Sequence, residues 1–336
     1  MIDVASLQTL GPSDEPSTLI IGSGSKSSVD LYIYPRLQNS SEARFLDSTK
    51  LGRPHWPLLR KETVIILNRY LSFRMLHWIR LNRSMIAKVY HLIDDDFAAM
   101  LWDSSILLLN RAKPLQTSIL QKLNYPARLG VDVHLLVSSR KLVLNHPGAT
   151  LIEPIANVPR FDAAQYARRD PRHVSYLAKM HLPEHRFLRG VFSKLEDQGV
   201  PYRLTVTAQG AAAKVWDGLP SVSIVPEMDY RGYKNFRARL GASISLAPLV
   251  PSRLNEARSA AKRVEIAEQQ SAGLFAHAPA YRRDDAAEEL HLPMDEALWA
   301  QSLAKLMNDD GERLKLAEAT NRIVRSDYAQ RDFLDG

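Results

Sequence analysis

The sequence predicts an α/β protein made of two domains, each with a parallel β-sheet that is covered by helices on both faces. The chain has 336 residues, which is too long for one small core and fits two domains of ordinary size. Short, continuously apolar runs alternate with segments of helical character, which is typical of a buried parallel sheet. The alternation stops at a polar, proline-punctuated stretch and then restarts, which indicates a linker between two similar units.

The first half of the chain contains the strands and helices of an N-terminal domain. Its predicted strands are Leu19–Ile21, Leu31–Tyr34, Val64–Leu67, Val89–Ile93, Val133–Val137 and Thr150–Ile152. Its clearest predicted helices are Ser72–Asn82 and Leu115–Leu123. A polar linker follows at Asn157–Asp162 and 166–171. We therefore assign residues 1–158 to the first domain.

The second half repeats the alternation. Its predicted strands are Val174–Leu177, Arg203–Ala208, Val222–Val225, Ile244–Ala247 and Gly273–Ala276. Its predicted helices are Glu184–Gln198, Tyr230–Leu240, Asn255–Gln269, Asp295–Met307 and Gly311–Ala329. We assign residues 159–312 to the second domain and 313–336 to a helix that returns to the first. Ligands of open parallel sheets bind beyond the carboxyl ends of the strands, so the site is expected in a cleft between the domains.

The composition narrows the class of protein. Hydrophobic residues make up 45% of the chain and charged residues 24%, as in soluble globular proteins. No apolar stretch approaches the ~18 residues of a membrane span, and the N-terminus does not resemble a signal peptide. The absence of cysteine excludes disulfides, thiolate nucleophiles and cysteine-bound metals. These features predict a cytoplasmic protein.

Positive charge is concentrated between residues 51 and 90. This segment has eight lysines and arginines against one acidic residue, an excess equal to the net charge of +7 of the whole chain. Its predicted helix mixes aromatic side chains such as Phe73 with Arg74 and Arg80. We expect residues 69–88 to contact the inner face of an anionic membrane, with an ordinary half-buried helix as the alternative. No recognised nucleic-acid-binding module is present, so no nucleic-acid partner is expected.

Three consecutive aspartates, Asp94, Asp95 and Asp96, follow the predicted strand Val89–Ile93 directly. Such carboxylates can bind Mg²⁺ or Mn²⁺, cap the next helix, or orient and deprotonate a hydroxyl group. No histidine or glutamate pattern supports a metal site, so we expect none, and the other two interpretations remain open. Arg69 ends the preceding strand in the same way and is expected to reach the same cleft.

The segment from residue 244 to 267 carries the most informative pattern. Its strand ends in Leu-Ala-Pro-Leu, and the polar residues that follow at fixed spacing are Asn255, Arg258, Ser259, Lys262 and Glu265. The segment resembles the Leu-x-Pro-Leu strand and the Phe-Asn-x-x-Lys-Ser-x-x-Lys-x-x-Glu helix of GT-B glycosyltransferases in the glycosyltransferase 4-like group. The resemblance spans roughly residues 60–330. It implies two Rossmann-like domains that face each other across a cleft, with C-terminal helices packing back toward the N-terminal domain.

The resemblance also implies a donor site on the second domain. Arg258, Ser259 and Lys262 would bind the diphosphate of a nucleotide sugar, Glu265 would accept the ribose hydroxyls, and Asn255 would lie beside them. The alternative is an amphipathic helix whose charges merely face water. The first glutamate of the family's usual pair would fall at Ala257, so the sugar contact that it makes must come from elsewhere or be absent.

Two further groups complete the predicted site. The turn Tyr176–Glu184 resembles a family motif, and it makes Lys179 a phosphate ligand and His181 a phosphate ligand or catalytic base. Strand ends of the first domain face the acceptor in this fold. We therefore place Asp94 and Asp96 as catalytic candidates, and Arg69 and Asp95 on the acceptor side.

The resemblance implies a hexosyltransferase that uses a nucleotide-diphosphate sugar, retains the anomeric configuration and requires no metal or other cofactor. The acceptor would be a glycan or a lipid-linked glycan in cell-surface polysaccharide synthesis. One alternative is a sugar-nucleotide epimerase of the same fold. The other is a non-catalytic homologue that serves as an assembly partner, an interpretation that Ala257 keeps open.

Overall fold

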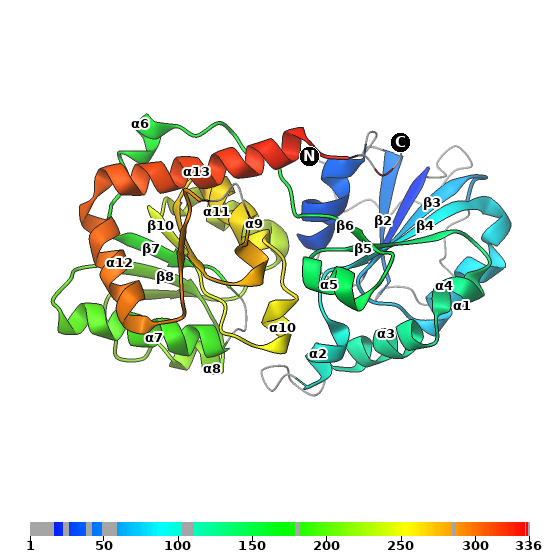
Figure 1. Cartoon of the computed structure of the whole chain (residues 1–336), viewed down its shortest axis with the longest axis horizontal. Helices are drawn as coiled ribbons and strands as arrows, with labels where there is room; N and C mark the ends of the chain where they lie inside the picture. The colour runs from blue at the N-terminus through cyan, green and yellow to red at the C-terminus, as the bar shows by residue number, and fades with distance from the viewer. Residues whose placement is uncertain are drawn as a thin grey trace.

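A computed structural model shows two α/β domains, each built around a six-stranded sheet (Figure 1). The structure describes residues 17–22, 27–37, 42–48, 59–102, 111–178, 182–283, 287–332 and 334. Neighbouring strands run parallel throughout both sheets. The predicted fold class is therefore confirmed.

The N-terminal sheet has the strand order β2-β1-β3-β4-β5-β6. Its strands are β1 (Thr18–Gly22), β2 (Ala43–Asp47), β3 (Thr63–Asn68), β4 (Ile86–Ile93), β5 (Val133–Val137) and β6 (Thr150–Leu151). Its α-helices are α1 (Phe73–Leu81), α2 (Phe97–Trp102), α3 (Ala112–Lys122), α4 (Tyr125–Leu129) and α5 (Arg140–Asn145). Helices α1, α3 and α4 cover one face of the sheet, where Ile65 and Val89 pack in one cluster with Ile79 and Leu120.

The predicted strand Leu31–Tyr34 is wrong, because these residues are helical. They belong to η1 (Val29–Ile33), a π-helical turn, and η2 (Tyr34–Arg36), a 3-10 turn. Pro35 lacks a backbone N–H and cannot serve an inner strand, so the apolar run is buried as a helix against the second face of the sheet. Strand β2, which the sequence did not predict, takes the edge position.

The C-terminal sheet has the strand order β12-β11-β10-β7-β8-β9. Its strands are β7 (His173–Tyr176), β8 (Arg203–Thr207), β9 (Val222–Val225), β10 (Ile244–Ala247), β11 (Ala272–Ala276) and β12 (Leu290–Leu292), of which β12 was not predicted. Its helices are α6 (Ala163–Tyr166), α7 (Leu182–Asp197), α8 (Ala211–Lys214), α9 (Tyr230–Leu240), α10 (Arg253–Glu256), α11 (Ala261–Gln269), α12 (Glu296–Asn308) and α13 (Asp310–Ala329), and a 3-10 turn, η6, covers Pro279–Tyr281. Buried side chains from both sheet faces form one core, which includes Trp216 and Trp299.

After α13 the chain crosses back to the N-terminal domain (Figure 1). Helix α13 packs on α11 and β11. Beyond it, the Leu334 N–H donates to the Arg36 carbonyl at 3.0 Å, and the Tyr90 hydroxyl donates to the Leu334 carbonyl at 2.9 Å. Among the helices that the structure describes, none is both long and apolar enough to cross a membrane.

Candidate functional site

A pocket of about 210 Å³ lies between the two domains, at the carboxyl ends of strands from both sheets. Seven charged side chains line it: Arg69, Asp94, Asp95, Glu184, Arg258, Lys262 and Glu265. The first three come from the N-terminal domain and the other four from the C-terminal domain. With Ser259, the structure thus brings seven of the predicted site residues into one cavity and adds Glu184.

Four of these charges form a chain across the domain boundary. Arg69 Nε lies 2.9 Å from Asp94 Oδ1, and the same guanidinium contacts Asp95. Asp95 in turn accepts from Arg258 of the second domain, with Nη1 2.6 Å from Oδ1. Arg69 adopts a φ of 68°, a left-handed conformation that is unusual for arginine and concentrates at functional sites. Asp95 therefore joins two cations that belong to different domains.

Burial and the neighbouring charges shift the pKa values of Asp94 and Arg69. Burial raises the pKa of Asp94 even though Arg69 opposes the shift, and Ser28 donates a hydrogen bond of 2.5 Å to the same carboxylate. Burial alone would lower the pKa of Arg69, but Asp94 and Asp95 outweigh it and raise that pKa. A cation held by two carboxylates remains charged, whereas Asp94 is a stronger base than an exposed aspartate.

Asp96 is directed away from the pocket and caps α2. The Ala99 N–H donates to its Oδ1 at 2.8 Å, and Asn145 Nδ2 donates to its Oδ2 at 3.2 Å. Arg253 lies 3.9 Å from the same oxygen. Of the two interpretations left open for the aspartates, capping describes Asp96, whereas Asp94 and Asp95 face the cavity.

The predicted single helix Asn255–Gln269 is wrong, because the structure has two helices, α10 and α11, separated by residues 257–260. Ser139 of the first domain donates to the Ala257 carbonyl at 2.8 Å, which occupies an acceptor that a continuous helix would use. Arg258 and Ser259 therefore lie in the loop that enters α11 and not on the side of a continuous helix. The Tyr32 hydroxyl of η1 donates to Ser259 Oγ at 2.5 Å.

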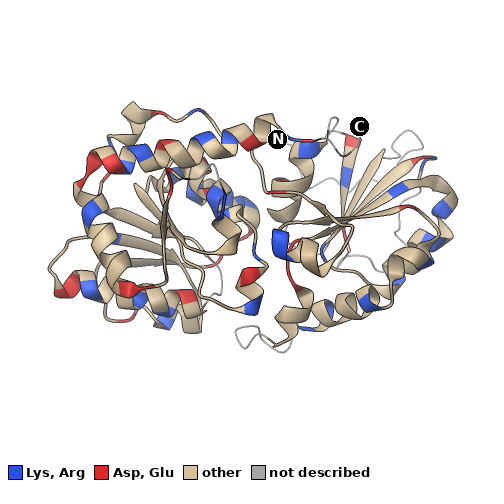
Figure 2. Ribbon diagram, viewed as in Figure 1, with Lys and Arg blue, Asp and Glu red and all other residues tan. Residues whose placement is uncertain are grey.

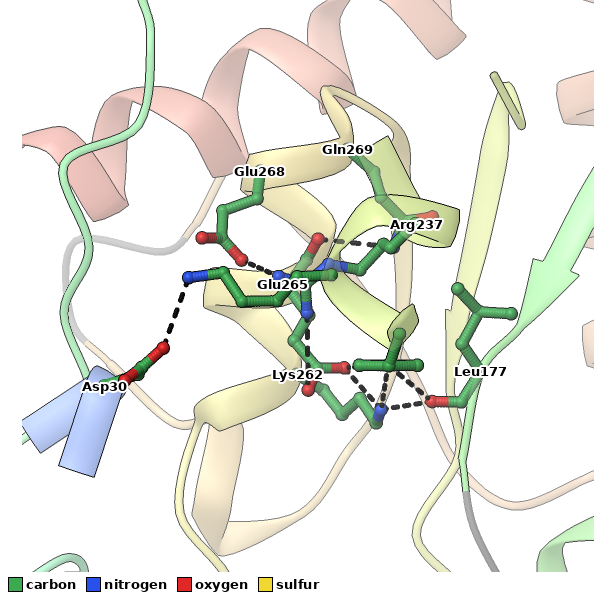
Figure 3. Close-up of polar contacts among 9 residues, drawn as sticks. Asp30, Leu177, Arg237, Lys262, Glu265, Glu268 and Gln269 are labelled. Atoms are coloured by element: carbon green, nitrogen blue, oxygen red, sulfur yellow. Dashed lines mark hydrogen bonds and ion pairs between the residues drawn. The ribbon is translucent and has the colours of Figure 1, made fainter. Parts of the chain in front are cut away.

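Lys262 and Glu265 lie within the first two turns of α11 and are joined directly (Figure 3). Lys262 Nζ is 2.5 Å from Glu265 Oε2 and also donates to the Leu177 carbonyl at the end of β7. The Tyr233 hydroxyl donates to the same Glu265 oxygen at 2.8 Å. Arg237 Nη1 approaches Glu265 Oε1 at 3.5 Å, so three donors surround one carboxylate.

Arg237 holds two acidic side chains of α11 at once, Glu265 and Glu268 (Figure 3). It is 4% exposed, and its pKa is raised because these carboxylates outweigh the effect of burial. Burial would raise the pKa of Glu265, but Lys262 and Arg237 lower it below the ordinary value. Glu265 is therefore ionised at neutral pH.

Asn255 does not line the pocket. Its amide donates to Glu184 Oε1 and to the Val250 carbonyl, both at 2.7 Å, and so ties the loop after β10 to the start of α7. Ala257 is buried in an apolar cluster with Ile93 and Phe97 of the other domain and does not line the pocket.

Lys179 and His181 lie outside the described residues. The sequence analysis did not assign a site role to Glu184, Tyr32, Tyr233 and Arg237. The spacing of Tyr233 and Arg237, four apart on one helix, places them on one face, but only the packing of α9 on α11 brings that face to Glu265. Among the described residues, no group of three or more histidine, aspartate or glutamate side chains is arranged to hold a metal ion.

No family model matches the chain, and no curated protein matches its sequence. Its fold is similar to that of several solved structures. HepE of Anabaena, solved with UDP and glucose, has a TM-score of 0.59 and 10% identity over 95% of this chain and 96% of that one. A glycosyltransferase from Rickettsia africae has a TM-score of 0.55 and 10% identity, covering 95% of each chain.

TarM of S. aureus has a TM-score of 0.54 and 9% identity over 79% of this chain. The match covers 52% of TarM, so this chain spans about half the length of that protein. These similarities show that the chain has the GT-B fold, as the sequence pattern predicted.

Proposed function

We propose that this protein is a glycosyltransferase that moves a hexose from a nucleotide-diphosphate sugar to a glycan or a lipid-linked acceptor in cell-surface polysaccharide synthesis. One observation carries the proposal: in a GT-B fold, the pocket between the domains joins Arg258, Lys262 and Glu265 with Asp94 and Asp95 across the boundary. The proposal includes retention of configuration, independence of metal, and peripheral contact with an anionic membrane.

The donor half of the site needs positive charge to stabilise the departing diphosphate. Glycosyl transfer passes through a carbocation-like state, and negative charge grows on the departing diphosphate. Arg258 and Lys262 supply cations, and the loop at Ser259 leads into the N-terminus of α11, whose free N–H groups favour an anion. Glu265, kept ionised by its neighbours, accepts the ribose hydroxyls. Lys179 and His181 remain proposed phosphate contacts.

The acceptor half needs a group that binds or deprotonates a hydroxyl. Asp94 fits this role because it lines the pocket and burial raises its pKa toward the range of a useful base. Arg69 and Asp95 would position it. The structures of HepE with UDP and glucose, and of a TarM variant with UDP, make UDP the first nucleotide to test.

Both predicted phosphate cations are paired internally, Arg258 with Asp95 and Lys262 with Glu265. A bound diphosphate would replace a carboxylate at each of them. Donor binding is thus proposed to exchange two internal ion pairs for contacts with phosphate.

A thermal-shift panel of UDP, GDP, CMP, TDP and their sugars tests the proposal. We expect one nucleotide to raise Tm strongly in the wild type and to lose that effect in Glu265→Ala and Lys262→Ala. Glu289→Ala is a matched control, because Glu289 is another buried carboxylate bound to an arginine, Arg263, but does not line the pocket. It should lower Tm and still respond to the nucleotide.

Failure of every nucleotide to shift Tm would reject the donor site. Formation of an isomer from a nucleotide sugar without any acceptor would replace the proposal with the epimerase alternative.

A further inference from the structure

A second cavity lies where the C-terminal segment crosses the N-terminal sheet. Its volume is about 680 Å³, and none of its described lining residues belongs to the interdomain pocket. It is lined by residues of β4, β5 and β6, by the segment after β6 and by the chain that follows α13. Small-molecule sites in proteins have volumes of roughly 300–1,000 Å³. The cavity is therefore large enough for a ligand of its own.

Positive charge exceeds negative charge in this cavity. Its charged lining residues are the cations Arg36, Lys88, Arg140, Arg283 and Arg331 and the acidic residues Glu153, Asp327 and Asp332. Glu153 and Asp327 are both paired with Arg283. Figure 2 shows basic and acidic residues together where the C-terminal segment, marked C, reaches the N-terminal domain. The other cations thus outnumber the one carboxylate that is left, Asp332.

Arg36 is the unusual member of this group, because it is buried without an acidic partner. It is 6% exposed, and its guanidinium donates to the Tyr32 carbonyl at 3.0 Å and to the Glu153 carbonyl at 2.8 Å. In the described part of the chain, no carboxylate forms an ion pair with it. Burial lowers its pKa to about 10, so it remains charged at neutral pH. Buried charges are ordinarily paired, so a buried cation that lines a cavity indicates a site for an anion.

Arg140 lies at the same end of the cavity as Arg36. Strands β5 and β6 pair through Val137 and Leu151. Arg140 and Glu153 follow these two residues closely, and the Glu153 carbonyl holds Arg36. Arg140 is exposed, lines the cavity and forms no ion pair with any residue that the structure describes. Two arginines therefore lie near this end of the cavity without carboxylate partners.

Apolar and aromatic side chains line much of the remaining cavity. Tyr90 and His134 lie side by side, with ring centroids 5.6 Å apart. Leu136, Ile152 and Ile155 also line the cavity. The cavity thus offers apolar surface to an organic group next to cations that suit a charged one.

We infer that this cavity is a second ligand site, which binds a small organic phosphate with its phosphate group on Arg36 and Arg140 and its organic part on the apolar side chains beside them. A guanidinium group can bind two phosphate oxygens at once, so one phosphate can satisfy both arginines. A carboxylate has only two oxygens and one charge, and it fits this pair less well. The inference does not depend on the proposed transferase activity.

Calorimetric titration with phenyl phosphate tests the inference on the full chain. We expect phenyl phosphate to bind more tightly than inorganic phosphate or benzoate, because it alone combines a phosphate with an apolar ring. Arg36→Met should weaken this binding at least about tenfold, since it removes charged hydrogen-bond donors. Arg140→Glu changes an exposed position, where folding is not at risk, and should weaken binding at least about fivefold. If Arg36→Met does not fold, the Arg140→Glu titration decides.

Arg169→Met is the matched control. Arg169 is also held by carbonyl oxygens, those of Ala242, Gln269 and Gln270, and it lines neither cavity. The variant should bind phenyl phosphate like the wild type.

Lys262→Ala shows which cavity the probe occupies, because Lys262 lines only the interdomain pocket. It should keep the binding of phenyl phosphate. Loss of binding in Lys262→Ala but not in Arg36→Met or Arg140→Glu would place the anion in the interdomain pocket and overturn the inference. No binding to the wild type, equal weakening in Arg36→Met and Arg169→Met, or tighter binding of benzoate would also overturn it. Nucleotide thermal shifts on the same samples report the donor site separately.

Discussion

Lys262 and Glu265, three residues apart on α11, form an ion pair in which Nζ lies 2.5 Å from Oε2 inside the interdomain pocket. If Lys262 turns to a phosphate, Glu265 loses this partner while it remains buried. Arg237 then becomes the cation that keeps Glu265 charged. The proposed donor site therefore depends on a residue that would not touch the nucleotide.

The substitution Arg237→Met tests this dependence. It leaves Glu265 and Glu268 buried without their shared cation, so the free energy of unfolding should fall by about 3–5 kcal/mol. Nucleotide affinity, measured by calorimetry, should also fall, and Arg237→Lys should restore part of it.

Arg263→Met provides the matched control, since Arg263 is equally buried and paired with Glu289. It should cost similar stability with unchanged nucleotide affinity. Equal affinity loss in both variants would mean that Arg237 acts only through general stability.

The pH dependence of stability follows from Glu265. Its pKa is lowered in the folded state, so its stabilising contribution is present above the unfolded-state value near 4.3 and is lost as pH falls through the folded pKa. Without Arg237 the folded pKa rises. Melting curves between pH 3 and 7 should show the acid loss of stability starting at a higher pH in Arg237→Met, and coincident curves would contradict this.

Asp95→Asn should strengthen nucleotide binding, by about fivefold, because the carboxylate that competes for Arg258 loses its charge. Asp96→Asn is its control, since Asp96 caps α2 outside the pocket and asparagine is an equally good cap. Titration of both variants with the nucleotide identified by thermal shift gives the comparison. Weaker binding in Asp95→Asn would show that Asp95 supports the donor site.

Transfer activity should fall at acid pH through a pKa above the ordinary aspartate value, because burial raises the pKa of Asp94 and a base must be ionised. Asp94→Asn should reduce the rate by about 10²–10⁴-fold and leave nucleotide binding intact. The measurement is a pH–rate profile with a fixed acceptor. A profile that is unchanged in Asp94→Asn assigns the base elsewhere.

EDTA should not reduce the transfer rate, because Arg258, Lys262 and the α11 N-terminus are expected to carry the charge of the departing diphosphate. The rate is compared before and after chelation, with Mg²⁺ or Mn²⁺ added back. Activity that EDTA abolishes and either metal restores would return the aspartates Asp94 and Asp95 to the role of metal ligands.

Several features of the fold and site could be predicted from the sequence. Arg69 and Asp94–Asp96 follow apolar runs directly, and their position at one edge of the sheet could be predicted because parallel strands bring their carboxyl ends to the same edge. The spacing of Lys262 and Glu265 predicted their common helix. These features could be predicted because each depends on the order and spacing of neighbouring residues within one strand or helix.

Other features depend on contacts between distant segments. The break before α11 arises from Ser139 of the other domain, and no local propensity predicts it. The run at 31–34 is apolar enough for a strand, but the chain buries it as a π-helical turn. Arg237 meets Glu265 only through the packing of α9 on α11, which the sequence does not encode locally.

The return of the chain after α13 has a mechanical consequence. The linker and the C-terminal segment cross between the domains side by side, and Arg283 fastens them by pairing with Asp327 at 2.6 Å and Glu153 at 3.7 Å. The pocket is bridged differently, by side-chain contacts such as Arg258 with Asp95. The two crossings, joined by Arg283, thus form a hinge between the domains. Rotation about this hinge would open the pocket while both crossings stay in place.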